Sequence, residues 1–292
     1  MTSVLDALIH LLSPAQTGSN TFVGQSQDLG WGTVFGGQVL GQALASAAYT
    51  VDPHRMAHSL HGYFLEPGHV DHPVQYTVER LRDGRSFSTR RVTAHQASTI
   101  IFTMTASFQI AEHGFEHTTT APKTTDPTHL PSSAERAKGF ARQLPEKIRH
   151  RALASQAIET RPVDPIDPFN PEIQAAEQYV WLRANGSVPS DPRIHQSLLA
   201  YASDFSFLTT ALRPHGVSWL TPGIRMASLD HALWFHRPSV MTSWLLHAID
   251  GPVSAGARAL VRGQIFDRKG QLVASSSQEG MIRMNQWRGT PS

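Results

Sequence analysis

The sequence contains no cysteine. This absence excludes a disulfide framework, a zinc site with cysteine ligands and a catalytic thiol, and it fits a reducing compartment. No apolar run reaches the length of a membrane span. The N-terminal segment 2–12 lacks the basic front and long apolar core of a signal peptide. We therefore expect a soluble cytoplasmic protein that does not associate with membranes.

An excess of charge of one sign is also missing, since 25 Lys and Arg stand against 23 Asp and Glu. Without a polybasic run, nothing predicts binding to nucleic acid. The GxSxG motif of α/β-hydrolases is absent, and glycines at 30, 32 and 36 miss the spacing of a dinucleotide-binding loop. The 16 His residues form no known ligand signature, so we predict no metal site.

The chain does contain an internal repeat, in which both halves carry similar segments in the same order. A length of 292 residues suits two domains. Each half offers a helix candidate, then a segment containing a Ser-Leu pair and aromatic residues, then strand-like runs that end at Gln109 or Gln278. The helix candidates are 36–51 and 195–212, and the segments after them are 58–68 and 226–238. This alignment matches SLHGYF with SLDHALWF and Gln109 with Gln278.

The strand-like runs carry hairpin signals. Residues 74–96 flank Asp83-Gly84, and residues 257–278 flank Lys269-Gly270. Each half thus combines one long helix with about five strands in mostly antiparallel order. That composition predicts an α+β protein in which a curved sheet wraps a helix.

We divide the chain into two domains and a joint. The domains are expected at 1–115 and 176–292, and the second contains Asp204. Residues 116–175 are rich in proline and turn-forming residues, which predicts a linker that crosses the surface. Ser132 and Glu135 form a capping-box pattern that predicts a short helix inside this linker.

Asp204 is the only charged residue between Gln196 and Leu212. An ionised carboxylate in such an apolar run needs partners, a ligand or a chemical role. Taken alone, an acid of this kind is more often part of a structural hydrogen-bond network. The matching helix candidate of the first half contains no acid, so we predict one catalytic centre per chain, in the second half.

Four segments in this order resemble the acyl-CoA thioesterase II family, and the similarity runs from about residue 5 to about residue 284. They are VFGGQVLGQAL, HSLHGYFLEPG, VERLRDGRSFSTRRV and ASLDHALWFHR. The resemblance implies two fused hotdog domains, each a curved antiparallel sheet around a central helix. It also implies hydrolysis of fatty acyl-CoA to fatty acid and coenzyme A, without a metal or redox cofactor, by a homodimer or homotetramer.

The resemblance assigns the family's acid to Asp204, its hydroxyl to Ser228 and its glutamine to Gln278, which together hold the attacking water. Many members carry Thr where this chain has Ser228, which keeps the hydroxyl on a more mobile rotamer. The chemistry asks for such residues. The thiol of coenzyme A, with a pKa of about 8.5, leaves without a strong general acid, so the reaction needs an activated water and a stabilised oxyanion.

Substrate-binding residues are expected around this triad. Backbone amides at the start of the first helix candidate suit an oxyanion, and Gly36 and Gly37 allow close approach there. His58 and His231 belong to the two matched segments and are expected near the site.

Arg85 and Arg91 lie in the segment RDGRSFSTRR, where guanidinium groups suit the phosphates of coenzyme A. A solvated strand face with local acid pairs is an equal alternative.

Two other functions fit parts of the same pattern. A hotdog enoyl-CoA hydratase calls for an Asp and His pair, for which Asp230 with His231 is the nearest match. A non-catalytic protein that binds or senses acyl-CoA would keep the pocket and lose turnover. The presence of all three polar residues of the triad favours the thioesterase.

Overall fold

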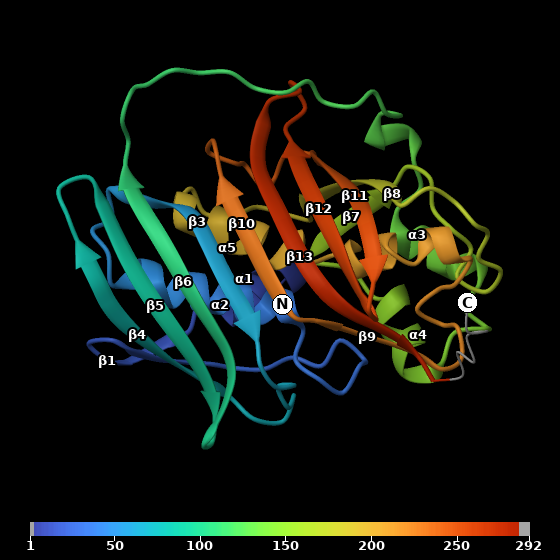
Figure 1. Cartoon of the computed structure of the whole chain (residues 1–292), viewed down its shortest axis with the longest axis horizontal. Helices are drawn as coiled ribbons and strands as arrows, with labels where there is room; N and C mark the ends of the chain where they lie inside the picture. The colour runs from blue at the N-terminus through green and yellow to red at the C-terminus, as the bar shows by residue number, and fades with distance from the viewer. Residues whose placement is uncertain (1–2, 286–292) are drawn as a thin grey trace.

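The computed structural model describes residues 3–285 as six α-helices and thirteen strands, with two short 3₁₀ turns (Figure 1). The helices are α1 Val4–Leu11, α2 Gly36–Tyr49, α3 Ser133–Gly139, α4 Glu146–Leu153, α5 Pro192–Ser203 and α6 Phe207–Thr210. The strands of the first half are β1 Ala15–Gly18, β2 Thr21–Gly24, β3 Arg55–Phe64, β4 Val74–Asp83, β5 Phe87–Gln96 and β6 Thr99–Ile110. The strands that follow are β7 Ile158–Pro162, β8 Glu177–Ala184, β9 Ile224–Ser228, β10 Asp230–Phe235, β11 Leu245–Ala255, β12 Arg258–Phe266 and β13 Leu272–Met284. Among the described residues, no helix is both long and apolar enough to cross a bilayer.

The strands form one continuous antiparallel sheet. Their order is β1-β2-β4-β5-β6-β3-β10-β13-β12-β11-β8-β7, with β9 paired to β13. The halves meet where β3 pairs with β10 and Leu60 lies opposite Leu233. Read outward from this seam, the two halves repeat the same strand pattern, which confirms the α+β fold of two fused hotdog units.

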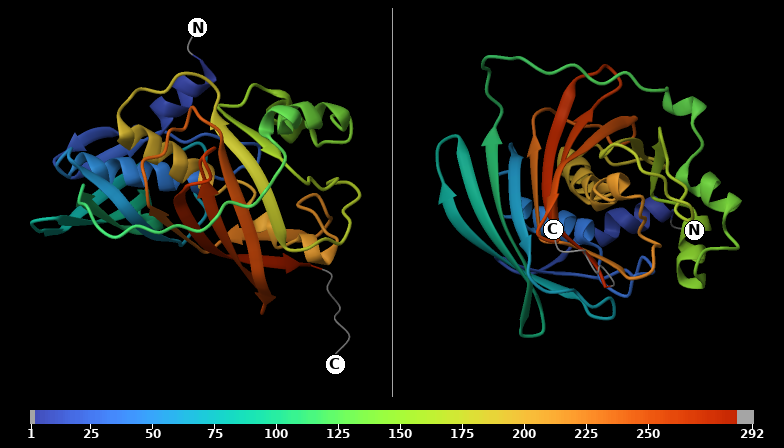
Figure 2. Two further views of the ribbon diagram at one scale, coloured as in Figure 1. Left: turned by 90° about the horizontal axis from the view of Figure 1, so that it is seen from above. Right: turned by 45° about the vertical axis from the view of Figure 1, so that its right-hand side comes forward.

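The central helices α2 and α5 lie together on the face around which the sheet curves (Figure 2). Their close approach depends on two glycines four residues apart. A Cβ at Gly37 would meet the carbonyl oxygen of Tyr201, and a Cβ at Gly41 would lie 3.0 Å from that of Ser197. Gly37 lies against Tyr201 and Gly41 lies against Ser197, so the contacts move toward the start of α5 as they move toward the end of α2. The two helices are therefore antiparallel, and the start of α2 meets the end of α5.

One apolar core joins the halves. Leu40 and Leu44 of α2 and Leu199 of α5 are at most 1% exposed and belong to the same cluster of buried side chains as Leu60 and Leu233 at the seam. Burying large aliphatic side chains contributes roughly 1.5–3 kcal/mol each. The halves are therefore stabilised together, and the helix ends that carry polar groups are held at fixed positions.

The segment expected to be a linker does cross the surface, from the end of β6 to α3 on the far side of the molecule (Figure 1). The capping box that begins α3 is present, with the Ser132 hydroxyl accepting from Glu135 N–H at 3.1 Å. The same segment also supplies β7, the last strand of the sheet. The range 116–175 is thus both a connection and part of the second half's sheet.

Candidate active site

Asp204 stands at a break in the helix rather than along its face. A continuous helix over 195–212 was expected, but α5 ends at Ser203 and Asp204 is its C-cap residue. Ser206 then adopts a left-handed conformation with φ of 63°, which separates α5 from α6. The prediction of one continuous helix was wrong because the apolar spacing continues past Ser203, whereas the left-handed backbone of Ser206 interrupts the helix. The break points the carboxylate toward α2.

The carboxylate of Asp204 caps the first central helix from the other half of the chain. Phe35, the N-cap residue of α2, provides no side-chain hydrogen bond. Instead the Gly37 N–H donates to Asp204 Oδ2 at 2.9 Å. An acceptor at a helix start satisfies an orphan amide and interacts favourably with the positive end of the helix dipole. Asp204 is thereby fixed in place by a bond that spans the two halves.

The protonation of Asp204 is set by opposing effects. Burial is the largest and raises the pKa of Asp204 above its ordinary value. A proton on His231, which would give the ring a positive charge, together with the Gly37 amide and the Gln278 side chain, opposes this rise. The net direction is upward, which makes the carboxylate a better proton acceptor than a free aspartate when it is ionised.

Ser228 and Gln278 complete the polar cluster. Ser228 ends β9, and Gln278 lies on β13 with its side chain on the helix side of the sheet, 1% exposed. Gln278 Nε2 donates to Ser228 Oγ at 2.6 Å, and the Gln278 side chain acts to lower the pKa of Asp204. The structure therefore brings together the three residues expected from the resemblance, which come from a helix end and two strands.

His231 lies behind this cluster. Its Nδ1 is 2.6 Å from Gln278 Oε1, its Nε2 is 3.0 Å from Ser203 Oγ, and the residue is 1% exposed. It was expected to contact the substrate, but it is buried beneath Gln278. Burial lowers the pKa of His231, opposed chiefly by the charge of Asp204.

A cavity of about 1200 Å³ opens above Asp204, Ser228 and Gln278. Gly36, the first residue of α2, also lines it. The rest of its wall is largely apolar and comes from the Val34–Phe35 segment, the α5–α6 connection, β9 and the linker. A carboxylate, a hydroxyl and an amide in the wall of a largely apolar cavity suit the positioning of a water beside a ligand with a long apolar part.

Gly36 and Gly37 lie where they were expected, but their roles differ. The Gly37 amide is already used by Asp204, so it is not free to bind an oxyanion. A Cβ at Gly36 would lie 2.8 Å from Asp204 Oδ2 and 3.1 Å from the ring of Phe64. Glycine is needed at this position because any side chain would press on the carboxylate.

The structure places His58, Arg85 and Arg91 away from the cavity. His58 Nε2 is 2.8 Å from Ser107 Oγ, on the face of the sheet opposite the helices. Arg91 lies on that same outer face and forms an ion pair with Glu79 of the neighbouring strand. Arg85 is exposed in the β4–β5 turn. The alternative of a solvated strand face with an acid pair is what the structure shows for Arg91.

Gln109 is not the counterpart of Gln278. Its side chain donates to Glu112 on the outer face, whereas Gln278 faces the helices. Since side chains of a strand alternate between faces, a one-residue error in alignment reverses the face. When Ser59 is matched to Ser228, Gly62 is the residue that corresponds to His231. The residue that pairs with Gly62 on the neighbouring strand is Met104. The first half therefore has apolar residues at these positions.

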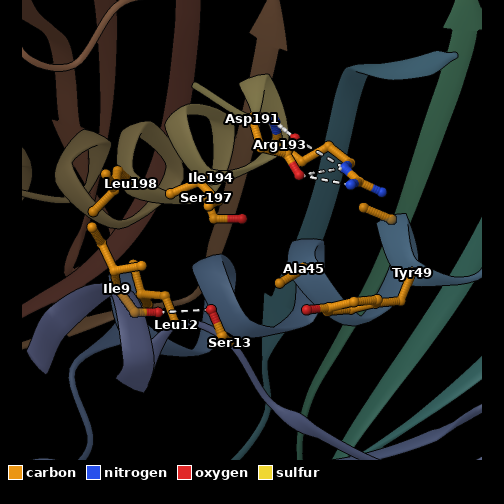
Figure 3. Close-up of a pocket in the computed structure, with 11 residues that line it drawn as sticks. Ile9, Leu12, Ser13, Ala45, Tyr49, Asp191, Arg193, Ile194, Ser197 and Leu198 are labelled. Carbon is orange, nitrogen blue, oxygen red and sulfur yellow. Dashed lines mark hydrogen bonds and ion pairs between the residues drawn. The ribbon is translucent and has the colours of Figure 1, made fainter. Parts of the chain in front are cut away.

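The other end of the helix pair, where α2 ends and α5 begins, has no counterpart of the Asp204 cap. A cavity of about 110 Å³ lies there between α1, α2 and α5 (Figure 3). Its charged side chains are Asp191 and Arg193, which pair with each other. Asp191 also caps its own helix by accepting from Arg193 N–H at 2.9 Å. The start of α5 is thus capped by a residue of its own segment, Asp191, and not by a carboxylate from α2.

Sequence reasoning did not identify the buried contacts of His231 or the position of Arg136. Arg136 of α3 lines the large cavity and forms no ion pair with any residue in the range 3–285. Its segment was interpreted as a surface linker, and no pattern in it indicated contact with the cavity. For His231, the period-two spacing with Leu233 and Phe235 was a usable signal of an inward side chain.

Comparisons with known proteins agree along the whole chain. Residues 149–281 match the acyl-CoA thioesterase family and residues 26–109 match the acyl-CoA thioesterase N-terminal domain. The chain is 43% identical over 286 residues to acyl-CoA thioesterase 2 of Haemophilus influenzae, covering 98% of this chain and 100% of that protein. It is 38% identical over 259 residues to human acyl-coenzyme A thioesterase 8, covering 86% and 81%. The crystal structure of the acyl-CoA thioesterase II TesB2 from Mycobacterium marinum is similar, with a TM-score of 0.78 and 36% identity over 97% of this chain and 100% of that one.

Proposed function

The chain belongs to the acyl-CoA thioesterase family, and we propose that it hydrolyses acyl-CoA in the large cavity with Asp204, Ser228 and Gln278 as its catalytic residues. The observation that carries this assignment is that all three line the large cavity, where Gln278 donates to Ser228 and favours the ionised form of Asp204. The family membership supports the reaction, and the geometry supports the residues.

In the first step Asp204 accepts a proton from water while the water oxygen attacks the thioester carbonyl carbon. Gly37 fixes the carboxylate through Oδ2. Ser228 already accepts from Gln278, so its own O–H is available to donate to the water. These contacts hold the water in one orientation, and such positioning can supply several kcal/mol of the barrier reduction.

The attack pushes the carbonyl electron pair onto oxygen, and this oxyanion needs a donor. We assign the Gly36 N–H, the first amide of α2, because it lines the cavity and donates to no acceptor within residues 3–285. Collapse of the tetrahedral intermediate re-forms the carbonyl and breaks the C–S bond. The thiolate of coenzyme A leaves and takes up the proton held by Asp204, which restores the carboxylate, and the fatty acid is released. No metal or redox cofactor enters this scheme.

An assay of thiol release tests the proposed function directly. Incubation with acyl-CoA of several chain lengths is expected to release free thiol. An enoyl-CoA hydratase would instead consume the conjugated double bond of crotonyl-CoA without releasing thiol, and a binding protein would do neither. The geometry disfavours the hydratase, because Asp230 accepts from Glu279 N–H on the opposite face from His231, and His231 is buried.

Substitution of the arginines separates the two views of coenzyme A binding. We expect Arg85→Ala and Arg91→Ala to leave KM for acyl-CoA unchanged, because both side chains lie outside the cavity. Arg136→Ala should raise KM on the order of 10-fold, since a hydrogen bond to a charged group contributes roughly 1.5–3 kcal/mol. Steady-state kinetics at two salt concentrations measures this, and a raised KM for Arg91→Ala alone would reverse the assignment.

The two glutamines provide a matched pair of variants. Gln278→Ala is expected to lower kcat by about 10²-fold, because the water loses a positioning contact and Ser228 loses its donor. Gln109→Ala should retain wild-type turnover, since its side chain bonds Glu112 on the outer face. Equal losses in the two variants, with both folds intact, would contradict the single-centre assignment.

Assembly and location remain predictions. A homodimer or homotetramer is supported by the exposed edge strand β1, all four residues of which are exposed, because unpaired strand edges favour association. Light scattering after size-exclusion chromatography measures the mass in solution. A cytoplasmic location is supported by the absence of cysteine.

A further inference from the structure

The side chain of Gln278 must be oriented as well as placed. Its amide has an acceptor end and a donor end of nearly the same shape, and a half-turn exchanges them. In the structure Nε2 faces Ser228 at 2.6 Å and Oε1 faces His231 at 2.6 Å. Only one of the two orientations is useful for the proposed reaction.

The charge of Asp204 identifies the useful orientation. The Gln278 side chain contacts this carboxyl and favours its ionised form. An amide NH₂ facing the carboxylate attracts it, whereas an amide oxygen there would repel it and raise its free energy in a site of low dielectric constant. Nε2 must therefore face the cavity, and Oε1 must face His231.

An amide oxygen facing His231 requires a proton on Nδ1. The imidazole is 1% exposed, and its burial lowers its pKa, which favours the neutral ring with a single ring proton. Its Nε2 is 3.0 Å from Oγ of the fully buried Ser203, which also lies 2.9 Å from the Ala200 carbonyl oxygen; the single hydroxyl proton can be donated to only one of these two acceptors, and the Nδ1–H tautomer requires that it point to Nε2. The ring of Phe207 packs against the imidazole with centroids 5.6 Å apart. The 2.6 Å contact between Nδ1 and the amide oxygen of Gln278 thus assigns the ring proton to Nδ1.

We infer that His231 is a positioning residue that donates from Nδ1 to Gln278 Oε1 and so holds the Gln278 amide with its NH₂ toward Asp204, Ser228 and the attacking water. His231 does not contact the substrate. This inference rests on the proposed function for its kinetic consequence, whereas the tautomer itself does not depend on turnover.

Two substitutions separate donation from packing. His231→Asn places an amide N–H close to the position of the imidazole Nδ1–H, and His231→Leu fills similar space without a donor. We expect His231→Leu to lower kcat by about 10- to 100-fold with little change in KM, as for other residues that orient a reacting group. His231→Asn should recover most of that loss. Equal losses in Asn and Leu variants, or no loss in either, would overturn the inference.

A double variant tests whether His231 acts through Gln278. In the Gln278→Ala background, His231→Leu should cause little further loss of kcat, because there is no amide left to orient. Losses that multiply in the double variant would overturn the inference. Thermal unfolding of each variant identifies those that are folded.

Nitrogen NMR of ¹⁵N-histidine protein tests the tautomer in the wild type, without any variant. The resonances of His231, assigned by their loss in His231→Asn, are expected to show a protonated Nδ1 and an unprotonated Nε2. The reverse pattern would overturn the inference even in an active enzyme. A protein with the Nδ1–H tautomer but no thiol release from any acyl-CoA would instead contradict the proposed function alone.

Discussion

Asp204→Asn is expected to lower kcat for acyl-CoA hydrolysis by roughly 10²- to 10⁴-fold, the range that a positioned general base contributes. Asparagine keeps an oxygen that can accept from the Gly37 amide, so the contact between the halves is retained. It cannot accept a proton from water. Turnover measured by thiol release is therefore expected to fall while substrate binding is kept.

The stability of this variant distinguishes a catalytic acid from a structural one. Burial raises the pKa of Asp204 in the folded protein. An acid with a raised folded pKa favours folding below its unfolded pKa, and this contribution is lost as pH rises through the folded pKa. At neutral pH the ionised carboxylate thus costs stability, so Asp204→Asn should have an equal or higher Tm than the wild type.

Asp191 supplies the matched control. Hydrogen bonds from Arg193 lower the pKa of Asp191 in the folded protein. Its contribution to stability is present above the unfolded pKa and is lost as pH falls through the folded pKa. Asp191→Asn should therefore lower the Tm at neutral pH and retain turnover. Loss of stability in Asp204→Asn with near-normal turnover would show that Asp204 is a structural acid.

Gly36→Val is expected to have the second-largest effect on turnover, a loss of about 10²-fold or more in kcat. Its Cβ would lie 2.8 Å from Asp204 Oδ2, so the carboxylate must move, and a displacement of about 1 Å can cost 10²-fold in rate. The Phe64 ring, 3.1 Å from the same Cβ, restricts movement of the new side chain.

Gly114→Val is the control for this substitution, because a Cβ at Gly114 would meet no atom within 4 Å. It is expected to retain wild-type kcat. Circular dichroism confirms that both variants are folded, and thiol release measures both. Unchanged turnover in Gly36→Val would remove Gly36 from the site, together with its assigned role at the oxyanion.

The parts of the fold that could be predicted from the sequence depend on local patterns. The helix α2 occupies most of the expected range 36–51, and the hairpins β4–β5 and β12–β13 have their turns close to Gly84 and Gly270. The capping box of α3 is present as expected. In each case residues within a few positions of one another determine the structure.

The parts that failed depend on contacts between distant segments. The end of α5 at Asp204 requires a left-handed Ser206, which the apolar spacing did not indicate. Gln109 was matched to Gln278 because each ends a strand-like run, but the sheet register turns Gln109 to the outer face. Arg91 was equally compatible with a ligand and with an acid pair until the register placed Glu79 opposite it.

The catalytic assignment also depended partly on local sequence patterns and partly on information that those patterns do not contain. Composition and spacing identified Asp204 as unusual, but its partners could be named only from the resemblance to a family. What the structure adds is the reason for the asymmetry between the halves. The start of α5 is capped by its own Asp191, and the start of α2, which lacks a local cap, receives Asp204 instead.

The pH dependence of kcat/KM tests the role of Asp204 as the general base most directly. In the wild type, kcat/KM should rise with pH along an acid limb whose midpoint lies above the ordinary pKa of aspartate, because burial raises the pKa of Asp204. The residual activity of Asp204→Asn should lack this limb. An Asp204→Asn enzyme that keeps the same acid limb, or the wild-type rate, would contradict the account.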